Sequence, residues 1–195
     1  MRRRSQKVAL SILGATAFTL AGCSAEEQID AQAFPDLPSC VEAAESDGLF
    51  SVEECRTAVA EAQTLHVESA PRYDSLTVCE EQHGAGACGS EETQAAGGSG
   101  GIFMPLLAGY LMGSMMSRGM GGMAASQPMY RTANGRFTNA AGTSTFGGNS
   151  GKAQLGAGQF NRPPATQGRA PMTRAMAASR GGFGGAGTAR GSYGG

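Results

Sequence analysis

The side chains best able to do chemistry in this 195-residue sequence are its five cysteines: Cys23, Cys40, Cys55, Cys79 and Cys88. A thiolate can attack a substrate, bind a soft metal ion or join a second thiol in a disulfide. No two of these cysteines form a Cys-x-x-Cys pair, and their surroundings are acidic, which disfavours a cluster of thiolates. We therefore expect no metal site.

The two histidines, His66 and His83, have no nucleophile at a spacing typical of a catalytic site. We expect His66 along a helix and His83 in a glycine-rich turn, so both are interpreted as ordinary surface or helix-end residues rather than general bases. No phosphate-binding glycine motif follows a strand-like segment. The sequence thus predicts a protein that is not an enzyme and uses no cofactor.

The N-terminus has the pattern of an export signal that ends in a lipid-attachment site. Residues 1–7 are basic, and the apolar run at 8–20 is too short to span a bilayer. The letters LAGC at residues 20–23 resemble the lipobox of bacterial lipoproteins, in which the cysteine accepts a diacylglycerol before cleavage. We expect residues 1–22 to be removed and Cys23 to carry the acyl chains, palmitate among them, that anchor the mature protein to a membrane.

The expected location is the cell envelope. Ser24 stands where an aspartate retains many lipoproteins in the inner membrane. The outer membrane, with the protein exposed to the periplasm, is therefore favoured, and the inner membrane is the alternative.

The other four cysteines are an even number in a chain expected to enter an oxidising compartment, so disulfides are the default interpretation. Three pairings are possible. Cys40 and Cys79 each lie six residues after an aromatic residue, Phe34 and Tyr73, in a loose internal repeat. This similarity favours the pairs Cys40–Cys55 and Cys79–Cys88.

Local signals place these cysteines on helices. Three capping boxes, in which a hydroxyl and a glutamate three residues later cap one helix end, are predicted. They are Ser39 with Glu42, Ser51 with Glu54, and Thr77 with Glu80. We expect a tether at 23–33 and then a small, acidic, disulfide-stapled α-helical module at 34–92, which is too small to fold readily without staples.

A Gly/Ser linker at 93–101 precedes an apolar, Met- and Gly-rich segment at 102–125. Small residues recur there at every fourth position, which predicts a helix with a close-packing seam. The seam is formed by Gly109, Gly113, Ser117 and Gly121. Self-association or docking on an envelope protein is expected through this helix. A membrane crossing is the alternative, although the uncharged run at 102–116 is shorter than the roughly 20 residues needed.

Residues 126–195 form a basic, low-complexity tail that is expected to be largely disordered, with one candidate β-hairpin at 129–138 around Asn134 and Gly135. All 16 acidic residues lie from Glu26 to Glu92, whereas nine of the 15 basic residues lie from Arg118 onward. Export argues against nucleic acid as a partner. An anionic envelope polymer, lipopolysaccharide or peptidoglycan, is the partner that the cationic tail would suit.

Several motifs in their order along the chain resemble one known family. They are the lipobox, FMPLLAGYLMG at 103–113, GRFTNAAGTSTFG at 135–147 and RGGFG at 180–184. Together they resemble the YgiB-like family of bacterial envelope proteins, whose function is not known. The resemblance implies a lipoprotein or membrane protein and offers no catalytic residues. We expect a non-enzymatic envelope lipoprotein with a structural or adaptor role, and a polymer-binding module is the alternative.

Overall fold

A computed structural model describes residues 27–95, 101–114 and 124–181. The signal sequence, Cys23, and the seam positions Ser117 and Gly121 lie outside the described residues. The expectations that concern them therefore remain predictions.

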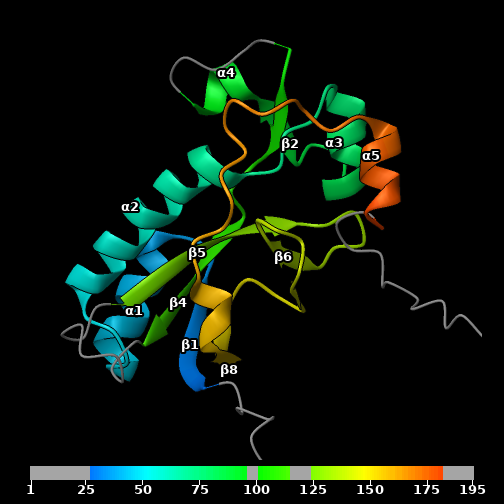
Figure 1. Ribbon diagram of the computed structural model, residues 1–195. Helices are drawn as coiled ribbons and strands as arrows, with labels where there is room; N and C mark the ends of the chain where they lie inside the picture. Colours follow the sequence, from blue (N-terminus) through cyan, green and yellow to red (C-terminus); the bar gives the residue numbers. More distant parts are fainter. Residues whose placement is uncertain (1–26, 96–100, 115–123, 182–195) are drawn as a thin grey trace, which may run out of the picture.

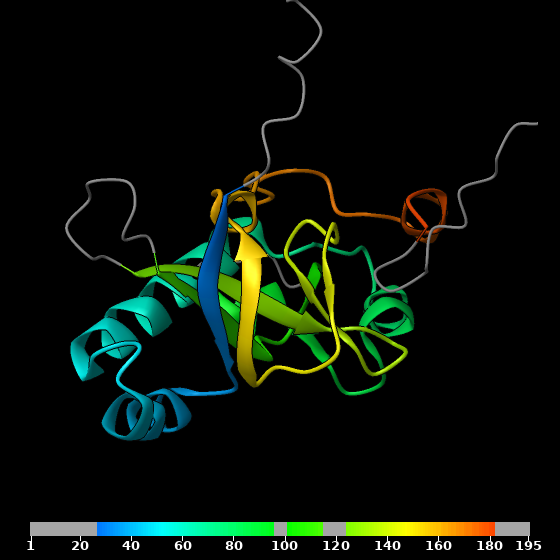
Figure 2. The ribbon, with the colours of Figure 1, turned by 90° about the horizontal axis from the view of Figure 1, so that it is seen from below.

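The centre of the fold is an antiparallel six-stranded sheet with the strand order β7-β6-β5-β4-β1-β8 (Figures 1 and 2). Its strands are β1 (Gln28–Phe34), β4 (Gly109–Ser114), β5 (Ala124–Arg131), β6 (Phe137–Asn139), β7 (Thr145–Phe146) and β8 (Gly151–Gly156). A second, two-stranded sheet pairs β2 (Cys88–Ser90) with β3 (Phe103–Pro105). The helices are α1 (Leu37–Asp47), α2 (Val52–Ser69), α3 (Leu76–His83), α4 (Glu91–Gln94), α5 (Arg174–Ser179) and the 3-10 helix η2 (Ala157–Phe160).

The predicted fold class, a helical module with an apolar helix and a disordered remainder, is wrong. Within the predicted apolar helix, residues 103–105 form β3, residues 109–114 form β4, and residues 124–125 begin β5. The reason lies in β4, which is buried on both faces: Tyr110 and Met112 pack against α1 and α2, while Leu111 packs with Ile29 of β1 and Phe160 of η2. A strand covered on both faces has an unbroken apolar sequence, which periodicity alone does not separate from a buried helix.

The glycines that suggested a helix seam serve the sheet. A Cβ on Gly109 would lie 2.6 Å from the carbonyl oxygen of Phe34, and its φ of +141° is rare for other residues. A Cβ on Gly113 would lie 2.6 Å from the Phe160 ring and 2.8 Å from Ile29. Close packing across β4 therefore accounts for the small residues at both described seam positions.

The helices of residues 34–92 are present, but they pack on the sheet and do not form a separate module. Helices α1 and α2 cover one face of it, as Figure 2 shows. The capping box of Ser51 and Glu54 is confirmed: the Ser51 amide donates to Glu54 Oε2 at 2.7 Å, and the Glu54 amide donates to Ser51 Oγ at 3.2 Å. The other two helices begin earlier than predicted, with Asp36 and Ser75 as their N-caps.

Both predicted disulfide pairs are confirmed. Cys40–Cys55 joins α1 to α2 with 5.8 Å between the Cα atoms, and Cys79–Cys88 joins α3 to β2 with 6.2 Å. The loops that they close span 15 and 9 residues. Each bridge thus links neighbouring elements in the first half of the chain.

The prediction of a disordered tail is wrong for residues 126–181. This segment supplies β5 to β8 and then crosses the molecule to reach α5, which packs beside α3 (Figure 1). The predicted hairpin at 129–138 is confirmed by the pairing of Tyr130 with Thr138 around a turn in which Gly135 has a φ of +78°. Residues 182–195 lie outside the described residues.

Candidate functional site

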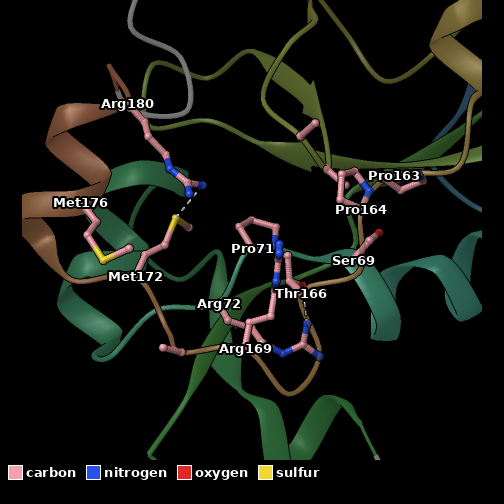
Figure 3. A pocket seen from close by; sticks show the side chains of 13 residues that line it. Ser69, Pro71, Arg72, Pro163, Pro164, Thr166, Arg169, Met172, Met176 and Arg180 are labelled. Carbon is pink, nitrogen blue, oxygen red and sulfur yellow. Dashed lines mark hydrogen bonds between the residues drawn. The ribbon is translucent and has the colours of Figure 1, made fainter.

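A groove with a volume of about 500 Å³ and three arginines in its lining is one of several hollows found in the described residues (Figure 3). We call it the arginine groove. One wall is the end of α2 and the turn after it, from Ser69 to Arg72, and another is the loop at Ala140 and Ala141. The rest comes from residues 163–180, which contribute two prolines, two methionines and two arginines to the lining. Its lining contains arginines and no carboxylate.

Backbone hydrogen bonds hold the crossing segment in place over the end of α2. The Thr166 amide donates to the Glu68 carbonyl at 2.8 Å, and the Met172 amide donates to the Arg72 carbonyl at 2.7 Å. The Asp74 amide in turn donates to the Met172 carbonyl at 3.1 Å. Backbone hydrogen bonds therefore hold this irregular segment in place at Thr166 and again at Met172.

Arg72 forms the base of the groove and is buried, with 3% of its surface exposed. Its Nε donates to Glu91 Oε1 at 2.6 Å, its Nη1 donates to Thr166 Oγ1 at 2.6 Å, and its remaining bonds go to the carbonyls of Ala70 and Val67. A planar guanidinium can join several elements in this way. Arg72 thus connects α2, α4 and the crossing segment, and its charge is compensated by Glu91.

Arg169 and Arg180 carry the uncompensated charge of the groove. Both are exposed, and within the described residues neither forms an ion pair with a carboxylate. Arg180 Nη1 lies 3.6 Å from Met172 Sδ, so its side chain extends over the groove (Figure 3). By contrast, Arg174 of α5 pairs with Glu81 of α3.

A smaller cavity of about 180 Å³ adjoins the arginine groove. The two share four lining residues, Ala140, Ala141, Pro163 and Pro164. We call the smaller one the amide annex because most of its polar side chains are amides: Gln127, Asn139, Gln159 and Asn161. Asn139 is fixed by its loop, since its Oδ1 accepts from the Thr143 amide at 3.0 Å and its Nδ2 donates to Thr143 Oγ1 at 2.9 Å.

Both histidines lie in the last turn of a helix, His66 in α2 and His83 in α3, as the helix-end interpretation expected. Both are nevertheless buried, which corrects the expectation of surface residues. His83 Nδ1 lies 2.7 Å from the Arg131 carbonyl and therefore donates to it, so Nε2, 2.9 Å from the Tyr73 hydroxyl, accepts from Tyr73. Burial lowers the pKa of His83 to about 4 and raises that of Tyr73. The imidazole is held neutral in one tautomer, which suits a structural role.

His66 has the same kind of environment. Its Nδ1 lies 3.1 Å from the Tyr130 hydroxyl, and burial lowers its pKa. The Tyr130 ring also lies edge-on to His83, with 6.4 Å between ring centroids. The two histidines and two tyrosines therefore form one internal network between α2, α3 and β5.

The predicted site residues lie elsewhere. Cys40, Cys55 and Cys79 are buried, and Gly109 and Gly113 lie inside the sheet, so none of them lines the arginine groove. Among the described residues no three histidine, cysteine, aspartate or glutamate side chains are grouped to hold a metal ion. No described helix has both the length and the apolar character that a membrane crossing requires.

A comparison with protein families decides the affiliation of the chain. Residues 28–194 match the family model described as "Protein of unknown function (DUF1190)". The chain belongs to this family. The match covers all of the sheet and the groove, and it confirms the resemblance stated from the sequence motifs.

The family includes curated relatives from several enterobacteria. The chain is 32% identical over 197 residues to the UPF0441 protein of Klebsiella pneumoniae, covering 93% of this chain and 81% of the relative. Against the UPF0441 protein of Yersinia pestis it is 32% identical over 202 residues, covering 93% and 82%. The match to the UPF0441 protein of Erwinia tasmaniensis is 38% identical over 104 residues and spans 46% of each chain. No solved structure matches the chain.

Proposed function

We propose that this chain is a lipid-anchored protein of the cell envelope that acts by binding rather than by catalysis. The observation that carries the proposal is the use of the cysteines. Two disulfides consume Cys40, Cys55, Cys79 and Cys88, which leaves only Cys23. Disulfides persist in oxidising compartments, and the remaining cysteine stands at the end of a lipobox-like sequence behind an export signal.

The position of β1 supports an anchor close to the membrane. Sheet structure begins at Gln28, five residues after Cys23, so the ordered chain starts earlier than the predicted tether at 23–33 allows. Five extended residues reach about 17 Å at roughly 3.4 Å each. A domain held by Cys23 would therefore lie against the surface of its membrane.

Two features favour binding over catalysis. Each histidine contacts the hydroxyl of a buried tyrosine, and His83 also donates to a backbone carbonyl. Neither imidazole lines the arginine groove, where a general base would have to lie. The arginine groove itself contains neither histidine nor cysteine nor carboxylate. General acid–base or nucleophilic chemistry requires such groups within hydrogen-bond reach of a substrate.

An envelope protein as partner remains part of the proposal, but docking through a helix at 102–125 does not, because that segment contributes strands. The alternative of an anionic polymer is favoured by one observation, the uncompensated charge of Arg169 and Arg180. A cationic groove attracts anionic ligands in an aqueous compartment.

The anchor is tested by metabolic labelling with a palmitate analogue in cells that express the wild-type chain, Cys23→Ala or the neighbouring control Ser24→Ala. We expect label on the wild type and on Ser24→Ala, with both proteins in the membrane fraction. Cys23→Ala is expected to carry no label. Label that persists on Cys23→Ala, or an unlabelled wild type, would overturn the proposal.

A further inference from the structure

The arginine groove and the amide annex adjoin each other, share part of their lining, and together make a hollow with two kinds of chemistry. The four shared residues, Ala140, Ala141, Pro163 and Pro164, carry no side-chain hydrogen-bond donor or acceptor. A ligand that passed over them would meet arginines on one side and, on the other, four amides together with Arg162, whose charge is paired with Glu68. The hollow therefore fits an extended ligand with an anionic part and a neutral, hydrogen-bonding part.

The annex suits hydroxyl groups. A side-chain amide has a donor and an acceptor side by side, as a sugar hydroxyl does. Gln159 Oε1 already accepts from the Ser144 hydroxyl, which fixes the orientation of the amide and leaves its NH₂ as the donor end. Gln127 Nε2 donates to the Asn161 carbonyl at 3.1 Å, which fixes a second amide. Several preoriented amides in a small cavity can bind hydroxyls without much further loss of side-chain entropy.

The groove suits a carboxylate or phosphate. Arg72 is neutralised by Glu91, so the field inside the groove comes from Arg169 and Arg180. Guanidinium groups bind both kinds of anion through charge-assisted hydrogen bonds. Met176, of which 42% is exposed, and Met172 add an apolar surface beside these charges that could pack against the C–H face of a sugar ring.

Size and composition separate this ligand class from others. The groove, at about 500 Å³, is in the range of pockets for organic ligands and well above the size of a single ion, and the annex adds about 180 Å³ beside it. No aromatic side chain lines either cavity, so the stacking platform typical of single-stranded nucleic-acid binding is missing from the described lining.

From these features we infer that the arginine groove and the amide annex together bind an anionic glycan, with the acidic group at Arg169 and Arg180 and sugar hydroxyls at the annex. The inference rests on the proposed function only for the source of the glycan, the cell envelope. Two sources offer this chemistry: a carboxylated peptidoglycan strand and the phosphorylated sugars of lipopolysaccharide. The acidic group differs between them, and the experiment below distinguishes them.

The experiment is a calorimetric titration of the full-length protein, purified from cells in detergent, with four probes. The probes are soluble peptidoglycan fragments, the phosphorylated core oligosaccharide of lipopolysaccharide freed from lipid A, a neutral dextran oligosaccharide, and inorganic phosphate. We expect saturable binding of one of the two anionic glycans, about tenfold tighter than the neutral glycan and inorganic phosphate. The preferred glycan identifies the source.

Two variants locate the site, and a third is the matched control. Arg169→Gln combined with Arg180→Gln is expected to weaken glycan binding by about tenfold, and Asn161→Ala by several fold. Arg136→Gln removes an exposed arginine at the β5–β6 turn, outside both cavities, and is expected to bind like the wild type. All three variants are expected to melt at the wild-type temperature because these side chains are exposed.

The inference is overturned if neither anionic glycan binds, if inorganic phosphate binds as tightly as the glycan, or if the double arginine variant binds like Arg136→Gln. A double variant that melts earlier is replaced by Arg169→Lys with Arg180→Lys, which keeps the charge but loses the bidentate fork and should bind less tightly. These outcomes do not depend on acylation of Cys23. If the labelling experiment fails, the anchor is refuted but the glycan site is not. If glycan binding fails, the glycan site is refuted but the anchor is not.

Discussion

Replacing Gly109 with alanine is expected to destabilise the protein more than the same change at any other described glycine of β4. The added Cβ would lie 2.6 Å from the backbone oxygen of Phe34, and backbone at that position cannot move without disturbing the β1–β4 pairing. Such overpacking costs about 1–3 kcal/mol. The φ of +141° adds strain of about 1–3 kcal/mol for a residue with a side chain. We therefore expect a loss of roughly 3 kcal/mol or more from the free energy of unfolding.

Gly113→Ala and Gly147→Ala are expected to lower the free energy of unfolding less than Gly109→Ala does. At Gly113 the new Cβ meets the tip of the Phe160 ring and the end of Ile29, side-chain atoms that can shift, so about 1–2 kcal/mol is expected. At Gly147 nothing lies within 4 Å, so little change is expected. Denaturant unfolding followed by circular dichroism, without reducing agent, measures all three. Gly109→Ala with the stability of Gly147→Ala would refute the placement of β4, whereas a helix seam would accept alanine at both seam positions.

Three further predictions concern the interior. Removing the Cys40–Cys55 bridge by a double change to alanine should cost about 3 kcal/mol, the chain-entropy value for its 15-residue loop, and reduced wild type, which loses Cys79–Cys88 as well, should unfold at a lower denaturant concentration than the variant. Arg72→Ala should cost about 3–5 kcal/mol because it leaves Glu91 buried without its partner, whereas Arg72→Met with Glu91→Leu should cost clearly less; equal losses would contradict a buried ion pair. The pKa of His83 is about 4 in the folded protein, below the 6.5 of an unperturbed histidine. The unfolded state therefore binds more protons than the folded state between these two pH values. Stability should therefore be fully present above about pH 6.5 and fall by up to about 3 kcal/mol as the pH drops toward 4; denaturant curves at pH 7 and 5 that coincide would contradict the burial of His83.

The helix cap, the hairpin turn and the disulfide pairing were predicted correctly because each depends on residues close together in the sequence. Ser51 and Glu54 cap α2 from within one turn, and the turn at Asn134 and Gly135 needs only its own backbone geometry. The disulfides also close short loops, so the repeat around Cys40 and Cys79 was enough to favour the pairing that is present. Each of these features depends on residues fewer than about twenty positions apart.

The sheet could not be predicted from the same signals because its order is set by distant pairings. Strand β1 lies between β4 and β8, which begin more than seventy residues later in the chain. The strand β8 reads GKAQLG, a polar and glycine-containing sequence without a strand pattern, and it becomes a strand because Gln28–Ala33 offers it a hydrogen-bonding edge. Strand propensity of this kind depends on tertiary context more than on the residues themselves.

The candidate site was missed for a related reason. Arg72 and Glu91 look like ordinary surface charges in the sequence, yet folding buries both against each other, and Arg72 also donates to Thr166. The arginines at 169 and 180 belong to a segment whose composition suggested disorder. One signal was available: the chain after Glu92 contains no carboxylate side chain, so its arginines could find partners only in the first half or in a ligand.

The central claim, a disulfide-bonded domain anchored through Cys23, is tested most directly by mass spectrometry of peptides from the protein isolated from cell envelopes without reducing agent. The predicted result is a mature chain that begins at an acylated Cys23 and contains the bridges Cys40–Cys55 and Cys79–Cys88. Free thiols at these four cysteines, or a chain that keeps residues 1–22 and an unmodified Cys23, would contradict it.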